Sequence, residues 1–353
     1  MSVSWSKKHR PKSNIDCPFL YWNNEIKEEL KSMKLEDIKF KTPKHVIEEI
    51  RNMNVKGGSA MGRAAAYAYK LACEQETFDT KHSIKDRFDY ISEELLTLKP
   101  TMATIFNTKD LVYKCLEFFP ETSNIAEIKS TIIELCERII NYSLEAVKYI
   151  GIFGGNMIND EDIIMMHSYS GSVINIFVHA AKEGKKFEVI CTESRPLRES
   201  RLAVDILSSY NMPVTFITDA SIWEFMPMVD YIIVEADTIC CDGCIANKIG
   251  TALISQLALL CKKNLYVASE IYKLDKRTGT GNRVILEKRP KDEIISAEET
   301  LNWKNVKIEN HFFDLTPARN ITGLITEFGL INPAMTIFYW EKLEQKILSV
   351  TTD

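Results

Sequence analysis

The sequence predicts an α/β protein in which a helical N-terminal domain, residues 1–150, precedes a doubly wound parallel sheet in residues 151–353. Two observations lead to this prediction. Before about residue 150, apolar residues recur three and four positions apart, which is typical of amphipathic helices. After about residue 160, short apolar runs alternate with helical segments, and this alternation is typical of a parallel sheet with right-handed crossovers.

An apolar stripe defines each helix of the first domain. The last of these helices is the longest, and we expect the glycine-rich stretch Gly151–Gly155 to end it. The expected helices are residues 25–33, 43–53, 59–73, 84–96, 109–118 and 125–150.

The second domain should contain five strands separated by helices. Its one long loop is expected at residues 276–283, whose Thr-Gly-Thr-Gly-Asn core should be mobile. The expected strands are residues 163–167, 187–191, 214–218, 231–234 and 265–268, and the expected helices are residues 173–183, 200–210, 221–225 and 249–260.

Composition is that of an ordinary globular protein, with 45% apolar residues, 26% charged residues and a net charge of −5. No run of 18 apolar residues occurs, so we expect no membrane span. The N-terminus lacks the apolar region of a secretory signal, which favours a cytoplasmic location. Nine cysteines, an odd number at irregular spacing, favour free thiols in a reducing compartment.

Two small clusters of residues are candidate sites for a metal ion and for nucleic acid. Cys240, Cys241 and Cys244 suggest half of a zinc site, but no second Cys or His pair follows at finger-like spacing. We therefore expect no metal, and no motif calls for a cofactor. The basic cluster at residues 7–12 is short and poor in aromatic residues, so a solvated tail is favoured over direct contact with nucleic acid.

The run Asp237–Gly250 is the most informative segment, because it lies between an apolar strand and an apolar helix. Asp237, Asn247, Lys248 and the amides of Ile249 and Gly250 would then meet where ligands bind in open α/β sheets. A carboxylate, a carboxamide and an ammonium on one turn favour a polar, phosphorylated small molecule. The alternative is a capped connection with no ligand.

Other strand ends supply groups of the same kind. Ser170 and Gly171 begin a helix and offer a hydroxyl and free amides to a phosphate. Arg195 adds a guanidinium that suits the same group. In the helical domain, the glycine-rich turn Lys56–Arg63 leads into a helix and is a candidate for a second anionic group. Each signal alone is weak. Because the groups are expected to meet at one edge of the sheet, together they favour a phosphorylated ligand.

These residues also carry a family resemblance. Over roughly residues 45–340, the chain resembles the superfamily of methylthioribose-1-phosphate isomerase, ribose-1,5-bisphosphate isomerase and the alpha, beta and delta subunits of translation initiation factor 2B. The resemblance implies a helical N-terminal domain, a Rossmann-like C-terminal domain and assembly into dimers or hexamers. The matching segments are Gly57–Arg63, Lys99–Thr101, His167–Gly171, Glu193–Pro196, Asp237, Asn247–Thr251, Phe313–Pro317 and Ile325–Gly329.

The resemblance implies site residues as well. In the isomerases a cysteine stands at the position of Ser168, and it moves protons together with the aspartate that corresponds to Asp237. A serine hydroxyl is far less acidic than a thiol, and the motif places no base beside it. Since general acid–base catalysis contributes about 10²–10⁴-fold, the change should remove much of the rate. Lys56 and Lys99 stand where the family has arginines, and they keep the charge but lose the planar fork.

Two functional hypotheses remain open. The first, slightly favoured, is a non-catalytic protein like the alpha subunit of initiation factor 2B, which binds a sugar or nucleotide phosphate and has translation initiation factor 2 as a possible partner. The second is an aldose–ketose isomerase of ribose 1,5-bisphosphate, or a related aldose 1-phosphate, that uses Asp237. An apolar C-terminal segment favours a homo-oligomer over packing inside the monomer; its residues are Leu330, Ile331, Met335, Ile337, Phe338 and Trp340.

Overall fold

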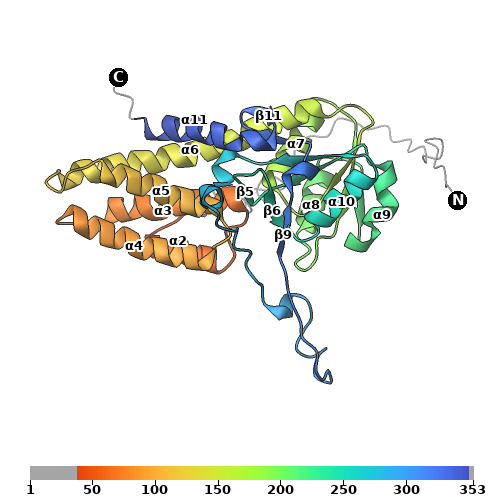
Figure 1. Ribbon diagram of the computed structural model, residues 1–353, viewed down its shortest axis with the longest axis horizontal. Helices are drawn as coiled ribbons and strands as arrows, with labels where there is room; N and C mark the ends of the chain where they lie inside the picture. The colour runs from red at the N-terminus through yellow and green to blue at the C-terminus, as the bar shows by residue number, and fades with distance from the viewer. Residues whose placement is uncertain (1–37, 350–353) are drawn as a thin grey trace. The chain divides into compact units, whose positions relative to one another are not determined.

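The fold begins with a layer of helices, drawn from orange to yellow in Figure 1. The computed structural model describes residues 38–349, so the expected helix at residues 25–33 and the basic cluster at residues 7–12 lie outside the described residues. The other five predicted helices are present, with ends shifted by a few residues. They are α2 (Pro43–Arg51), α3 (Gly58–Gln75), α4 (Lys81–Leu98), α5 (Ala103–Glu117) and α6 (Ile125–Met157).

Local chemistry explains where several of these helices start. The hydroxyl of Thr42 accepts a hydrogen bond from the backbone of His45 at the start of α2, and proline occupies the first helical position. Thr80 and Ser83 form a reciprocal capping box at the start of α4. The side chain of Asn124 caps the start of α6 by accepting a hydrogen bond from a backbone amide. These caps satisfy backbone amides that have no partner within the helix.

The predicted end of α6 at residue 150 is wrong, because the helix continues through the glycines to Met157. Helix α7 (Gly171–Lys182) packs directly against this part of α6. A Cβ atom on Gly154 would overlap the side chain of Ile176, and one on Gly155 would lie 2.6 Å from a ring carbon of His179. The glycines therefore allow two helices to approach closely. The proposed division into domains at residue 150 stays a prediction.

The second layer is a seven-stranded sheet with the order β11-β10-β7-β4-β1-β2-β3. All neighbours are parallel except β10 and β11. This confirms the predicted α/β class with a parallel sheet, and within this sheet the two strands β10 and β11 were not predicted. The strands are β1 (Ile163–Met166), β2 (Glu188–Thr192), β3 (Val214–Ile217), β4 (Tyr231–Glu235), β7 (Asn264–Ala268), β10 (Gly323–Thr326) and β11 (Gly329–Ile331), and the connecting helices include α8 (Ser200–Ser209), α9 (Ile222–Phe225) and α10 (Thr251–Leu260).

The order of strands creates a crevice at the middle of this sheet. The chain runs from β1 outward to β2 and β3, and then returns to place β4 on the other side of β1. The pairing of Ile164 with Tyr231 fixes this contact. At such a switch point the connections after neighbouring strands leave in opposite directions, so their carboxyl ends border an open space. The residues that follow β1 and β4 lie at this switch point.

A second, smaller sheet was not predicted. Its order is β8-β5-β6-β9, formed by β8 (Leu274–Asp275), β5 (Thr238–Cys240), β6 (Ile245–Lys248) and β9 (Phe313–Thr316). The expectation that Asp237–Gly250 forms one turn between a strand and a helix is therefore wrong, because most of it is the antiparallel hairpin β5–β6. No local pattern indicated this sheet, since β9, the partner of β6, lies about seventy residues further along the chain.

The predicted loop at residues 276–283 begins with a short 3-10 helix, Lys276–Thr280, whose start is capped by the side chain of Asp275. Near the C-terminus, helix α11 (Thr336–Leu348) contains the last three residues of the apolar segment. Trp340 is buried and stacks on Tyr272. Four other apolar residues of the segment are between 43% and 53% exposed: Leu330, Met335, Ile337 and Phe338. Among residues 38–349, every helix is too short or too polar to span a lipid bilayer.

The close contact between α6 and α7 leads to a first prediction. Gly154→Ala should lower the free energy of unfolding by about 1–3 kcal/mol, because the added methyl group forces the buried Ile176 out of its position. Gly171→Ala is the matched control, since a Cβ atom at that glycine meets nothing within 4 Å. Urea denaturation measures both. Equal stability of the two variants would contradict this account of the long helix.

Candidate functional site

The candidate site lies where β1 and β4 end, at the switch point of the large sheet. Ser168 follows β1 by two residues and Asp237 follows β4 by two residues. Ser168 is buried with a positive φ of 71°, and its backbone amide donates a hydrogen bond to the hydroxyl of Ser194 at 2.7 Å. The serine is thus held rigidly at the edge of the crevice.

Glu199 is a site residue that the sequence analysis missed. The hydroxyl of Ser168 donates a hydrogen bond to Oε1 of Glu199 at 2.9 Å, and Nζ of Lys248 lies 2.5 Å from the same oxygen. The motif around Ser168 places no base beside the serine, as expected, but the fold brings the carboxylate of Glu199 to it from another segment of the chain. Glu199 precedes α8 and reaches the serine from the neighbouring strand connection. No pattern in the sequence distinguishes it from a surface glutamate.

Asp237 is half-buried and surrounded by charges. Burial raises the pKa of its carboxyl group to about 7, and the carboxylate of Glu235 adds to the rise, while the ammonium groups of Lys273 and Lys248 oppose it. Its backbone amide donates to the carbonyl of Ala246, which joins it to the β5–β6 hairpin. A carboxyl group that titrates near neutral pH can both accept and return a proton.

Lys273 is the second residue that the sequence analysis missed. The side chain is fully buried, and Nζ lies 2.5 Å from Oε1 of Glu235 and 3.0 Å from the carbonyl oxygen of Ala236. Burial disfavours its charge, but the carboxylates of Glu235, Glu270 and Asp237 outweigh that effect and raise its pKa. Its place shortly after the strand β7 was the signal that could have indicated it.

Lys248 and Asn247 are buried at the end of β6. The ammonium group of Lys248 lies 3.0 Å from the ring centroid of Phe312, and burial lowers its pKa despite the nearby Glu199. The amide of Asn247 donates to the hydroxyl of Thr251 at 3.0 Å. Both predicted binding residues therefore have partners within the protein.

The backbone amides of Ile249 and Gly250, which were predicted to bind a ligand, donate hydrogen bonds within the protein. The amide of Ile249 donates to the carbonyl of Phe312, and that of Gly250 donates to the carboxylate of Asp314 at 2.7 Å. The same carboxylate accepts from Ala252. Asp314 thus serves as the anion at the start of α10, so this helix end does not need a ligand.

The N-terminal glycine turn does reach the site. A Cβ atom on Gly58 would lie 3.1 Å from Lys273 and 3.2 Å from the carbonyl oxygen of Asp237. Helix α3 starts here with no side-chain cap, so its first amides are available. Lys56 and Gly57 are exposed in front of it.

Arg63 and Lys99 have inward partners. A guanidinium nitrogen of Arg63 donates to the hydroxyl of Ser143 at 3.0 Å, and that hydroxyl donates to Glu270. Nζ of Lys99 lies 3.4 Å from a carboxylate oxygen of Glu287. Both predicted phosphate ligands are therefore already engaged with polar side chains.

Ser170, Gly171 and Arg195 lie after β1 and β2. Ser170 caps α7 by accepting from the backbone of Val173, and Gly171 is exposed with open space beside it. The guanidinium of Arg195 donates to the carbonyl oxygen of Ile294 at 2.8 Å. A cavity of about 410 Å³ opens beside Arg195, lined also by Pro196, Ile249, Ile294, Glu309, Asn310 and His311.

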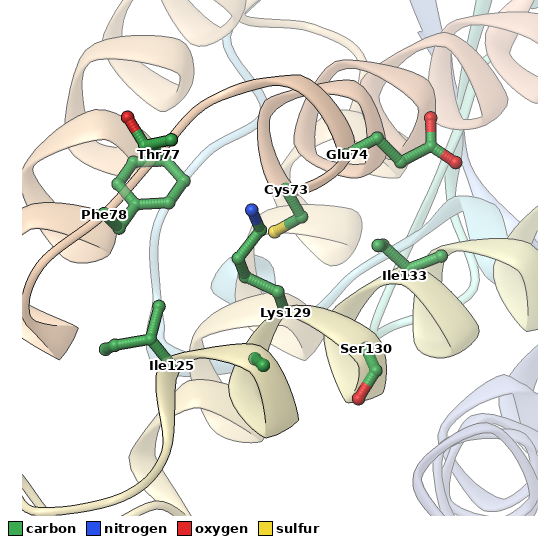
Figure 2. Close-up of a pocket in the computed structure, with 9 residues that line it drawn as sticks. Cys73, Glu74, Thr77, Phe78, Ile125, Lys129, Ser130 and Ile133 are labelled. Atoms are coloured by element: carbon green, nitrogen blue, oxygen red, sulfur yellow. The ribbon is translucent and has the colours of Figure 1, made fainter.

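A larger hollow of about 530 Å³ lies in the helical layer, where Figure 2 shows Cys73, Phe78 and Lys129 around it. It is formed by the last turn of α3, the following loop and the start of α6. Gly58 and Cys73 are fifteen residues apart on one helix, which places them about 22 Å from each other. This hollow is therefore separate from the strand-end site and shares no residue with it.

Comparisons with known proteins agree with this architecture. The chain matches the Initiation factor 2 subunit family over residues 54–333. It is 34% identical to ribose 1,5-bisphosphate isomerase of Methanocaldococcus jannaschii over 299 residues, which cover 85% of this chain and 94% of that protein.

Two solved structures from Pyrococcus horikoshii OT3 are also similar. The translation initiation factor eIF-2B has a TM-score of 0.67 and 29% identity, covering 82% of this chain and 97% of that one. The 5-methylthioribose 1-phosphate isomerase has a TM-score of 0.69 and 26% identity, covering 86% of this chain and 88% of that one.

The helical N-terminal layer and the mostly parallel sheet define an α/β protein with a site at the ends of its strands. The chain belongs to the Initiation factor 2 subunit family. This confirms the resemblance inferred from the sequence. The relatives carry two kinds of names, sugar-phosphate isomerase and initiation factor.

The raised pKa of Asp237 predicts a pH effect on stability. Between about pH 4 and pH 7 the folded protein holds a proton that the unfolded chain has lost, so the free energy of unfolding should fall as pH rises through this window. Asp237→Asn does not titrate and should show a shallower fall. Urea denaturation across the window measures this. The exposed Asp205→Asn on α8 is the control, and equal slopes in all three proteins would contradict the assignment.

Proposed function

We propose that this chain binds a pentose phosphate at the ends of β1 and β4 and acts through binding, with little or no isomerisation. The observation that carries the proposal is the hydrogen bond from Ser168 to Glu199. Ser168 stands at the position of the family's cysteine, and its hydroxyl group does not titrate near neutral pH. The rest of the crevice keeps the groups that suit a phosphorylated sugar.

Two helix N-termini support the binding of phosphate. Helix α3 starts without a cap beside Lys56, and α7 starts at the exposed Gly171. Each has unpaired amides and a favourable dipole for an anion. The buried Lys248 and Lys273 are instead neutralised by Glu199 and Glu235. We therefore assign phosphate groups to the two helix ends, and sugar hydroxyls to the charged groups between them.

Weak catalysis follows from the partners of Ser168. The carboxylate oxygen that accepts its hydrogen bond also lies 2.5 Å from the ammonium group of Lys248, so it is shared between two donors. A hydroxyl paired with such a carboxylate is a poor substitute for a thiol that ionises near pH 8.5. The protein keeps the pocket and loses one of the two proton carriers.

Binding can be measured by calorimetry with ribose 1,5-bisphosphate. Wild type should release or absorb heat. Lys56→Ala should weaken the affinity by about 10- to 150-fold, because an ammonium–phosphate contact is worth about 1.5–3 kcal/mol. Lys44→Ala, on the exposed face of α2, is the control and should bind as wild type does. The absence of heat and of any thermal shift with pentose phosphates would end the proposal.

A second candidate function is aldose–ketose isomerisation, and the pKa of Asp237 favours it. A carboxyl group with a pKa of about 7 suits proton transfer at neutral pH. A relative that is 34% identical carries the name ribose 1,5-bisphosphate isomerase. In this function Asp237 would move one proton and Glu199 would receive the other through Ser168.

The substitution Ser168→Cys separates the two candidates. If the wild type is inert because a thiol is missing, the variant should gain activity toward ribose 1,5-bisphosphate by about 10²–10⁴-fold, and Asp237→Asn added to it should remove the gain. Product analysis by NMR measures the turnover. A wild type that already isomerises the sugar at an enzymatic rate, and stops when Asp237→Asn is introduced, would replace the binding function with the enzymatic one.

Assembly and partners belong to the same proposal. The half-exposed apolar residues Leu330, Ile337 and Phe338 support self-association. For the binding function, translation initiation factor 2 is the protein partner that we propose, because initiation factors share this fold and family.

A further inference from the structure

We propose that the turn of the β5–β6 hairpin is a binding site for a thiophilic divalent cation, with zinc as the natural choice. The ligands are the thiols of Cys240 and Cys244 and the carboxylate of Asp242. One ligand atom from each of these residues lies within 4.8 Å of the others. No other group of three His, Cys, Asp or Glu residues between residues 38 and 349 meets this condition.

The distances suit the coordination geometry of zinc. Zinc binds thiolate sulfur at about 2.3 Å and carboxylate oxygen at about 2.0–2.2 Å, so a tetrahedral site needs its sulfur atoms about 3.8 Å apart. That separation lies inside the observed limit of 4.8 Å. Small rotations of the side chains are enough to close the site. Two thiolates also favour zinc over magnesium or calcium, which prefer oxygen ligands.

The backbone of the turn is already fixed in the required shape. The amide of Cys240 donates to the carbonyl of Cys244 at 2.7 Å, and the amide of Gly243 donates to the carbonyl of Cys240 at 2.9 Å. Gly243 has a φ of +81°, and an added Cβ atom would lie 2.8 Å from Pro333. Oδ1 of Asp242 accepts from the amide of Cys244, which orients the carboxylate and leaves Oδ2 for the cation.

Cys241 is excluded from the cluster although it lies between the ligands in sequence. Its thiol lies 3.5 Å from the carbonyl oxygen of Asp275, and its amide donates to the hydroxyl of Thr278. The side chain is therefore held on the other side of the turn. This contrast provides a matched control within the same five residues.

The site has an open side. Asp242 is exposed and Cys244 is half-buried, whereas Cys240 is buried against Ala246 and Val284. Three protein ligands with one side toward solvent leave a fourth position for water. The cation would lock the turn of the hairpin whose two strands start after Asp237 and end at Lys248. This inference does not depend on the proposed function, because the site and its test involve the cation alone.

The test is a titration of the reduced, full-length chain with Co²⁺, followed by displacement with Zn²⁺. Wild type and Cys241→Ser should each bind one equivalent at the turn and show the absorption of cobalt bound to thiolate. Cys244→Ser should lose this band, and Asp242→Asn should weaken the affinity by about tenfold or more. Asp242 lies on the exposed turn, so its variant remains informative if a substitution of the buried Cys240 prevents folding.

Zinc should also raise the melting temperature of wild type and of Cys241→Ser more than that of Cys244→Ser, because a ligand of the folded state stabilises it. Equal cobalt affinity in wild type, Cys244→Ser and Asp242→Asn would overturn the proposal. So would a wild type that binds no cobalt, or a chain that is purified without zinc and with a disulfide between Cys240 and Cys244.

Discussion

The ion pair between Lys273 and Glu235 is the constraint on which the architecture of the site depends. A fully buried ammonium group is tolerated only when a carboxylate and further polar atoms surround it, and here Glu235 and the carbonyl of Ala236 supply them. These partners come from the end of β4, while Lys273 comes from the segment after β7. The pair therefore holds the segment that follows β7 against the end of β4, its neighbour in the large sheet. Gly58, at the start of α3, packs against the same lysine and ties the helical layer to that edge.

This arrangement sets the electrostatics of the crevice. Each buried cation near Asp237 already has an anionic partner: Lys273 has Glu235, Lys248 has Glu199, and Lys99 has Glu287. Within residues 38–349 the carboxyl group of Asp237 forms no ion pair of this kind, and burial raises its pKa to about 7. The groups proposed to bind an anion are instead the backbone amides at the N-termini of α3 and α7, which have no partner within the helix. In the proposed function, phosphate and the proton-carrying carboxyl group therefore occupy different parts of one site.

The sequence predicted those elements whose signal is local. Apolar periodicity located five described helices and the central parallel strands, and capping residues such as Thr42 and Asn124 mark their starts. The sequence-based prediction was wrong for elements whose packing partner lies far away in the sequence. The small sheet needs Phe313–Thr316 beside the β5–β6 hairpin, and α6 continues through glycines because α7 packs against them. Glu199 was missed for the same reason, since its role depends only on the approach of Ser168 and Lys248.

The sequence by itself determined the family, the α/β class and the residue types available to the site, because motifs and periodicity are written in neighbouring residues. It also determined that a serine replaces the thiol of the isomerases at position 168. Only the tertiary structure decided which charges face each other. The pairing of Ser168 with Glu199 and the neutralisation of Lys248 both arise from side chains whose orientations depend on packing. Those orientations are set by non-local contacts, and a linear pattern does not contain them.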